Sequence, residues 1–141
     1  MSWEIDYKKK LRTPQEALRC VQSGMRVYIQ PGCAEPETLV EALMERGPHV
    51  EDVEIVHMMT MGSAPYVAPE MAGHFRHNAV FIGGNVRDAI NDGRADYTPI
   101  YLSEIEELFT SGAMPIDVAL LELSPPDSHG FCSFGVGVDT S

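Results

Sequence analysis

The sequence lacks any apolar run that approaches the roughly 18–20 residues needed to cross a bilayer. Its first ten residues end in consecutive lysines with no apolar core after them, so they do not read as a secretory signal. These absences argue against a membrane-spanning or secreted protein. We therefore expect a cytoplasmic protein with no membrane partner.

Basic residues are also scarce. Ten lysines and arginines stand against 21 aspartates and glutamates, which gives a formal net charge of −11. A surface this acidic repels phosphate backbones and anionic lipids, so nucleic acid is not an expected partner. Cys20, Cys33 and Cys132 lack metal-site spacing, and the five histidines show no paired ligand spacing. We expect no metal, and cysteines that stay free thiols.

The sequence does contain an alternation of short strand-like segments with helical segments. Its 141 residues are enough for one domain with a hydrophobic core, and 44% hydrophobic residues is ordinary for a globular protein. The alternation predicts an α/β fold with an open, mostly parallel sheet and helices on both faces. We see no repeat or linker, so residues 1–141 should form a single domain.

Capping residues, glycines and prolines set the expected boundaries of these segments. Thr13 with Glu16, and Ser103 with Glu106, have the spacing of capping boxes at helix starts. The expected helices cover residues 13–24, 36–46, 69–73, 85–92 and 103–110. The expected strands cover residues 26–30, 53–58, 79–82, 96–98 and 116–123, with one more at 131–138.

Two loops that follow strands contain candidate ligand-binding positions, because open parallel sheets bind ligands at the carboxyl ends of their strands. Gly32, in the turn 30–36, would let the backbone approach a ligand closely. Gly84 and Asn85 stand where a strand ends and a helix begins, where free N–H groups attract carboxylates or phosphates. The sequence leaves two simpler interpretations open, namely a tight turn at Gly32 and a plain helix cap by Asn85.

The histidines divide by their surroundings in the sequence. His129 lies in a turn-rich loop of a kind that often contributes to binding sites, so we treat it as a candidate lining residue. His57 lies within an expected strand and should be buried. His49, His74 and His77 look like loop or surface residues.

Two long stretches resemble a known family. Residues 85–104 (Asn-Val-Arg-Asp-Ala-Ile-Asn-Asp-Gly-Arg-Ala-Asp-Tyr-Thr-Pro-Ile-Tyr-Leu-Ser-Glu) and residues 124–141 (Ser-Pro-Pro-Asp-Ser-His-Gly-Phe-Cys-Ser-Phe-Gly-Val-Gly-Val-Asp-Thr-Ser) are similar to the N-terminal domain of the acetyl-CoA hydrolase/transferase family. This is the branch of family I CoA-transferases that includes 4-hydroxybutyrate CoA-transferase. The resemblance implies a Rossmann-like open sheet of the CoA-transferase/NagB type.

Members of this family are considerably longer, so the resemblance implies that the chain is the N-terminal domain of a longer enzyme. The run 139–141 (Asp-Thr-Ser) is a helix-start signal with no helix after it, which agrees with this expectation. The expected partners are the C-terminal domain of the same enzyme and further copies in a homo-oligomer. The isolated chain should be inactive.

The family resemblance implies transfer of CoA between an acyl-CoA and a short-chain carboxylate such as acetate, butyrate or 4-hydroxybutyrate. The CoA thioester is then a substrate, and no permanently bound cofactor is expected. The reaction passes through a glutamyl-CoA intermediate, and both the nucleophilic glutamate and a glycine-rich loop belong to the absent C-terminal domain. Glu122 lies at a strand end, where a nucleophile could act, but the resemblance argues against that role. No catalytic residue is therefore assigned in this chain.

The loop 60–66 (Thr-Met-Gly-Ser-Ala-Pro-Tyr) resembles the segment from which these enzymes take one backbone N–H of the oxyanion hole. Such a donor stabilises negative charge on a thioester oxygen. The candidates for it are Met61, Gly62, Ser63 and Ala64. Two alternatives to a transferase remain, acyl-CoA hydrolysis on the same scaffold and a non-catalytic binding or regulatory module.

Overall fold

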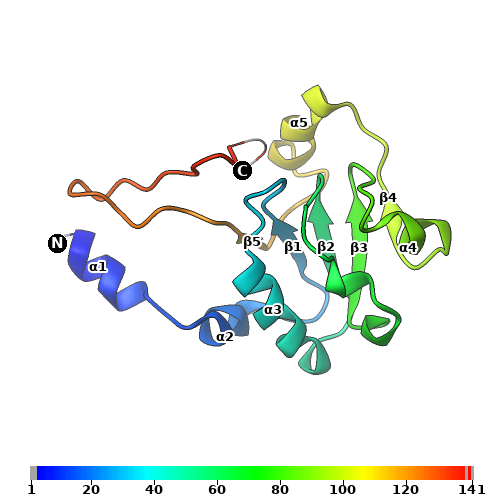
Figure 1. Cartoon of the computed structure of the whole chain (residues 1–141), viewed down its shortest axis with the longest axis horizontal. Helices are drawn as coiled ribbons and strands as arrows, with labels where there is room; N and C mark the ends of the chain where they lie inside the picture. Colours follow the sequence, from blue (N-terminus) through cyan, green and yellow to red (C-terminus); the bar gives the residue numbers. More distant parts are fainter. Residues whose placement is uncertain (1–2, 139, 141) are drawn as a thin grey trace.

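The computed structural model describes residues 3–138 and 140, and its centre is a five-stranded sheet (Figure 1). The strand order is β4-β3-β2-β1-β5, and every pair is parallel. The strands are β1 (Arg26–Ile29), β2 (Val53–His57), β3 (Phe75–Ala79), β4 (Asp96–Tyr97) and β5 (Val118–Leu120). The predicted open parallel α/β sheet is confirmed.

Helices cover both faces of this sheet, because residues on both faces of the central strands are apolar. One buried cluster joins Val27 and Ile55 to Leu43 on α3, and a second joins Val56 to Ile105 on α5. The α-helices are α1 (Trp3–Lys10), α2 (Pro14–Ala17), α3 (Glu37–Arg46), α4 (Arg87–Asn91) and α5 (Ile105–Thr110). The 3₁₀ turns are η1 (Leu18–Cys20), η2 (Gly47–His49), η3 (Pro65–Val67), η4 (Pro69–Met71) and η5 (Leu102–Glu104). In the described part of the chain, no helix is both long and apolar enough to cross a membrane.

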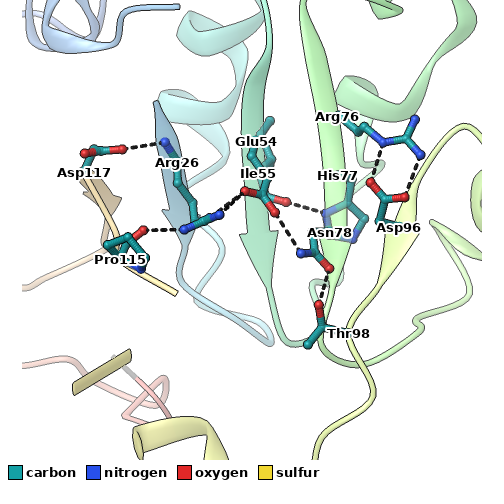
Figure 2. Close-up of polar contacts among 10 residues, drawn as sticks. All are labelled: Arg26, Glu54, Ile55, Arg76, His77, Asn78, Asp96, Thr98, Pro115 and Asp117. Carbon is teal, nitrogen blue, oxygen red and sulfur yellow. Dashed lines mark hydrogen bonds and ion pairs between the residues drawn. The ribbon is translucent and has the colours of Figure 1, made fainter. Parts of the chain in front are cut away.

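A row of polar side chains crosses the sheet and fixes its register (Figure 2). Arg26 on β1 donates to Glu54 on β2 at 2.6 Å, and Asn78 on β3 donates to the other Glu54 oxygen at 2.8 Å. Thr98, just after β4, donates to Asn78 at 2.9 Å. The Asp117 carboxylate, just before β5, accepts from the Arg26 backbone N–H at 2.8 Å.

This row explains why the predicted strand at 79–82 is wrong. The strand is β3, Phe75–Ala79, whose middle residues are polar and therefore look like a loop in the sequence. Arg76 pairs with Asp96, and Asn78 donates to Glu54. His77 Nδ1 bonds to the Ile55 carbonyl, so contacts with neighbouring strands stabilise this polar strand. Val80 is buried, but it lies beyond the end of the strand.

Two boundary predictions at the carboxyl-terminal side are also wrong. The strand expected at 116–123 is only β5, Val118–Leu120, and residues 131–138 form no strand. The Ser103 capping box is displaced, since the Glu104 carboxylate accepts from the Tyr101 N–H at 3.3 Å. The Thr13–Glu16 box is confirmed by reciprocal hydrogen bonds of 3.2 and 3.1 Å. The helix-start signal at 139–141 falls at positions of which 139 and 141 lie outside the described residues.

Residues 121–138, here named the C-terminal arm, extend from the sheet beside α1 (Figure 1). Ser124 and Ser133 pair across the arm, with a 2.9 Å bond from the Ser124 N–H to the Ser133 carbonyl. The far end returns to β1, where the Gln30 amide donates to the Gly137 carbonyl at 2.7 Å.

Candidate active-site cleft

A hollow lies at the carboxyl ends of β1 and β5. In the strand order, the sheet grows from β1 in one direction through β2 and in the other through β5, and such a reversal is where open α/β sheets bind ligands. A cleft of about 650 Å³ opens there. Its lining residues are Gly32, Cys33, Glu35, Pro36, Glu37, Thr38, Leu39, Met61, Gly62, Leu121, Glu122 and Leu123.

Gly32 brings the first two strand-end loops together. Its φ of +71° lies in the left-handed region that favours glycine, and its N–H donates to the Met59 carbonyl at 2.6 Å. A parallel bridge pairs Gly32 with Thr60. Gly32 lines this cleft and fixes the turn, while its role beside a ligand stays a prediction.

Glu35 anchors the loop 60–66 from the β1 side. Only 6% of its surface is exposed, and its carboxylate accepts from the Gly62 N–H at 2.7 Å. Burial raises the pKa of Glu35 above its usual value, and hydrogen bonds from the Gly62 N–H and the Thr60 side chain oppose that rise. This carboxylate is not among the site residues expected from the sequence. The signal for it was a glutamate directly before the proline that opens a helix after a strand.

Asn85 anchors the same loop from the β3 side. Its amide nitrogen donates to the Gly62 carbonyl at 2.9 Å, and it also lies 3.1 Å from the Thr60 hydroxyl and 3.3 Å from the Thr60 carbonyl. The interpretation of Asn85 as a plain helix cap is wrong, because α4 begins at Arg87 and Val86 takes the cap position. Gly84, its neighbour, does not line the cleft.

The four oxyanion candidates differ in their surroundings. Met61 is 71% exposed at the cleft, whereas the Ala64 side chain is buried and its φ is +50°. The Gly62 N–H is bound to Glu35. Ser63 is exposed and lines an adjoining hollow of about 430 Å³ together with Glu37 and Glu41. Within the described residues, the N–H groups of Ser63 and Ala64 have no hydrogen-bond acceptor, and of the two residues only Ser63 is exposed.

A buried polar cluster supports the end of this loop. The Tyr66 hydroxyl lies 2.6 Å from His57 Nε2, and the His57 and His77 rings stack with centroids 4.1 Å apart. His57 is buried as predicted, but the surface position predicted for His77 is wrong, since only 1% of it is exposed. Burial lowers the pKa of both histidines, that of His77 to about 4, and raises the pKa of Tyr66. All three groups are therefore neutral at pH 7.

His129 lies away from the cleft. It is exposed in the turn of the C-terminal arm, where its N–H donates to the Asp127 carboxylate at 2.8 Å, and it is not among the lining residues. Gln30, which is not among the site residues expected from the sequence, directly follows β1. It is fully buried and joins the end of β1 to the arm through Glu122 and Gly137.

The charges of the cleft are of one sign. Glu35, Glu37 and Glu122 line it, and its described lining contains no lysine, arginine or histidine. In residues 3–138 and 140, no group of three or more histidine, cysteine, aspartate or glutamate side chains could hold a metal ion. The polar side chains at the cleft are these three carboxylates, the Cys33 thiol and the Thr38 hydroxyl.

Comparison with known proteins agrees with this picture. The family profile of the acetyl-CoA hydrolase/transferase N-terminal domain matches residues 1–141. The chain is 46% identical over 139 residues to 4-hydroxybutyrate coenzyme A transferase of Clostridium kluyveri, covering 99% of this chain and 32% of the relative. It is 43% identical over 128 residues to the succinyl-CoA:acetate/propanoyl-CoA:succinate CoA transferase of Fasciola hepatica, covering 89% of this chain and 26% of the relative.

Solved structures share the fold. RipA from Yersinia pestis superposes with a TM-score of 0.88 at 26% identity, covering 99% of this chain and 35% of RipA. The 4-hydroxybutyrate CoA-transferase of Porphyromonas gingivalis gives a TM-score of 0.75 at 28% identity, covering 96% and 30%. The chain spans about a third of the length of these proteins. It belongs to the acetyl-CoA hydrolase/transferase N-terminal domain family.

Proposed function

We propose that this domain forms one wall of the active site of a CoA-transferase that moves CoA between an acyl-CoA and a short-chain carboxylate such as acetate, butyrate or 4-hydroxybutyrate. The observation that supports it is a backbone donor, the Ser63 N–H, left without a protein acceptor in a loop at a strand-end cleft. Relatives that share this domain are named CoA transferases.

The chemistry assigned to this domain is stabilisation of charge. When a carboxylate attacks the thioester carbonyl, the carbonyl oxygen gains a negative charge, and a positioned N–H lowers the energy of that state. Expulsion of the CoA thiolate then gives a mixed anhydride. Return of the thiolate to the enzyme carbonyl breaks the anhydride, which releases the first carboxylate and leaves an enzyme-bound CoA thioester. The second carboxylate takes the CoA by the reverse sequence and frees the enzyme carboxylate. The nucleophilic glutamate is assigned to the remaining part of the complete protein, as the family resemblance implies.

The acidic cleft is consistent with a domain that does not bind CoA alone. Glu35, Glu37 and Glu122 would repel the CoA phosphates, so a cationic site on the remaining part of the protein must provide that contact. We propose that this part and further copies of the protein are its partners, that CoA enters as a substrate rather than as a resident cofactor, and that the protein is cytoplasmic.

The test is product analysis with the complete protein, acetyl-CoA and butyrate. The expected result is butyryl-CoA and acetate in equal amounts, at a rate on the order of 10 s⁻¹. Free CoA without butyryl-CoA would instead establish hydrolysis, and no reaction would support a binding module. The 141-residue chain alone serves as the control and should give neither product. Turnover by the 141-residue chain would contradict the assignment of the nucleophile to the remaining part of the protein. Glu122 would then be the first candidate nucleophile.

A further inference from the structure

Gly62 is held on both sides by side chains from the neighbouring strand-end turns. Glu35, after β1, accepts from its N–H, and Asn85, after β3, donates to its carbonyl at 2.9 Å. β2 lies between β1 and β3 in the sheet, so the two anchors approach its loop from opposite sides. The two peptide planes that meet at Gly62 are thereby fixed.

These contacts determine the direction of the next N–H group. In a trans peptide the carbonyl of one residue and the N–H of the next point in opposite directions, and the described chain has no cis peptide. Because the Gly62 carbonyl points to Asn85, the Ser63 N–H points away from Asn85. That direction leads from the β3 side toward the side of β1 and α3, where Ser63 lines the hollow beside the cleft.

The Asn85 amide donates its hydrogen bonds to this loop. Both the Thr60 and the Gly62 carbonyls lie within its reach, and its own carbonyl oxygen is buried without a hydrogen-bond partner in the described part of the chain. A side chain placed only to cap α4 would instead accept from the helix N–H groups, and no such bond is present within the described residues.

We propose that Asn85 is a positioning residue that holds the Gly62 carbonyl and so aims the Ser63 N–H at the thioester oxygen of the acyl-CoA. This inference rests on the proposed transferase function. Asn85 itself does not contact the substrate. It acts through the orientation of one peptide group, so its loss should lower turnover and leave substrate affinity nearly unchanged.

The experiment compares Asn85→Asp with Asn91→Asp in the complete protein, using acetyl-CoA and butyrate. An ionised aspartate has the shape of asparagine but cannot donate, and it would face two carbonyls. Asn91 is exposed at the end of α4 and introduces the same charge away from the loop. We expect kcat of Asn85→Asp to fall by about tenfold to a hundredfold with little change in KM. Hydrogen exchange of a peptide covering 58–66 should become faster, and Asn91→Asp should resemble wild type in both respects.

Unchanged kcat and unchanged loop exchange in Asn85→Asp would overturn the inference while the proposed function stands. Should Asn85→Asp not fold, Asn85→Ser, which removes the amide without adding charge, must show the same fall in kcat and faster loop exchange. A wild-type protein without transfer activity would overturn the proposed function, and with it the role given to the Ser63 N–H.

Discussion

At the scale of single residues, the contact between Glu35 and Gly62 determines how the cleft is built. A buried carboxylate needs hydrogen-bond donors, and here the donors come from a backbone N–H and a neighbouring threonine. The absence of a side chain at Gly62 leaves the space that the carboxylate occupies. A Cβ there would lie 2.8 Å from the Glu35 carboxyl carbon.

Gly62→Ala should therefore displace the Glu35 side chain and remove its bond to the Gly62 N–H. The φ of Gly62 is not in the left-handed region, so the expected loss is only about 1 kcal/mol of unfolding free energy. In a Glu35→Ala background the same substitution should cost almost nothing. Urea unfolding of wild type, Gly62→Ala, Glu35→Ala and the double variant measures these free energies. Gly84→Ala is the control, because a Cβ at Gly84 would meet no atom within 4 Å. Equal costs in both backgrounds would show that the carboxylate is not the obstacle.

The buried histidines predict a dependence of stability on acid. Burial lowers the pKa of folded His77 from 6.5 to about 4, so the unfolded chain takes up this proton first. The contribution of neutral His77 to the unfolding free energy is fully present above pH 6.5 and is lost as the pH falls to about 4. The loss should approach roughly 3 kcal/mol, at 1.36 kcal/mol per pKa unit. Glu35, with a raised pKa, acts in the opposite direction, losing stability as the pH rises above 4.5.

The measurement is the unfolding free energy of wild type and His77→Asn between pH 7 and pH 4. The asparagine amide can still donate to the Ile55 carbonyl, which lies 2.9 Å from His77 Nδ1, but it cannot be protonated. The variant should lose less stability on acidification than wild type. His49→Asn, at an exposed position, should keep the wild-type slope. Parallel curves for wild type and His77→Asn would contradict the assignment.

At the scale of elements, the polar row across the sheet stabilises strands that apolar packing alone would not specify. Arg26 and Glu54 are only 25% and 28% exposed at their side chains, and Asn78 depends on the same glutamate (Figure 2). Glu54→Ala would leave both donors without their partner, so we expect a loss of about 2 kcal/mol of unfolding free energy. Glu51→Ala, at an exposed position, should cost less than about 0.5 kcal/mol. Similar costs for the two variants in urea unfolding would contradict this role.

The same row shows where prediction from sequence succeeded and where it failed. β1, β2 and α3 follow from local apolar patterns and breakers, and their observed bounds differ from the expected ones by no more than one residue. β3 was missed because its Arg-His-Asn centre is stable only next to Glu54 and Asp96, which are distant in sequence. The loop 60–66 was found from its resemblance to the oxyanion segment of the family. The contacts of Glu35 and Asn85 depend on register between strands, which no local pattern reveals.

At the scale of the whole molecule, the C-terminal arm is the segment that we expect to promote association of the isolated chain. Phe131, Val136 and Val138 are 74%, 84% and 60% exposed, and exposed apolar groups promote association. The isolated chain should therefore associate as its concentration rises. Light scattering should show less association for Phe131→Ser combined with Val136→Ser. Leu102→Ser, equally apolar and 65% exposed beside η5, should have little effect. A wild-type chain that stays monomeric at every concentration would contradict this account of the arm.

If this domain supplies a backbone N–H to the transferase site, as we propose, removing that one hydrogen should slow transfer. Ser63→Pro deletes the N–H, and the φ of Ser63 is not positive, so proline does not meet a left-handed conformation there. Ser63→Ala removes the hydroxyl and keeps the N–H. In the complete protein with acetyl-CoA and butyrate, kcat of Ser63→Pro should fall by about a hundredfold or more, with Ser63→Ala close to wild type. A folded Ser63→Pro protein that turns over at the wild-type rate would contradict the claim.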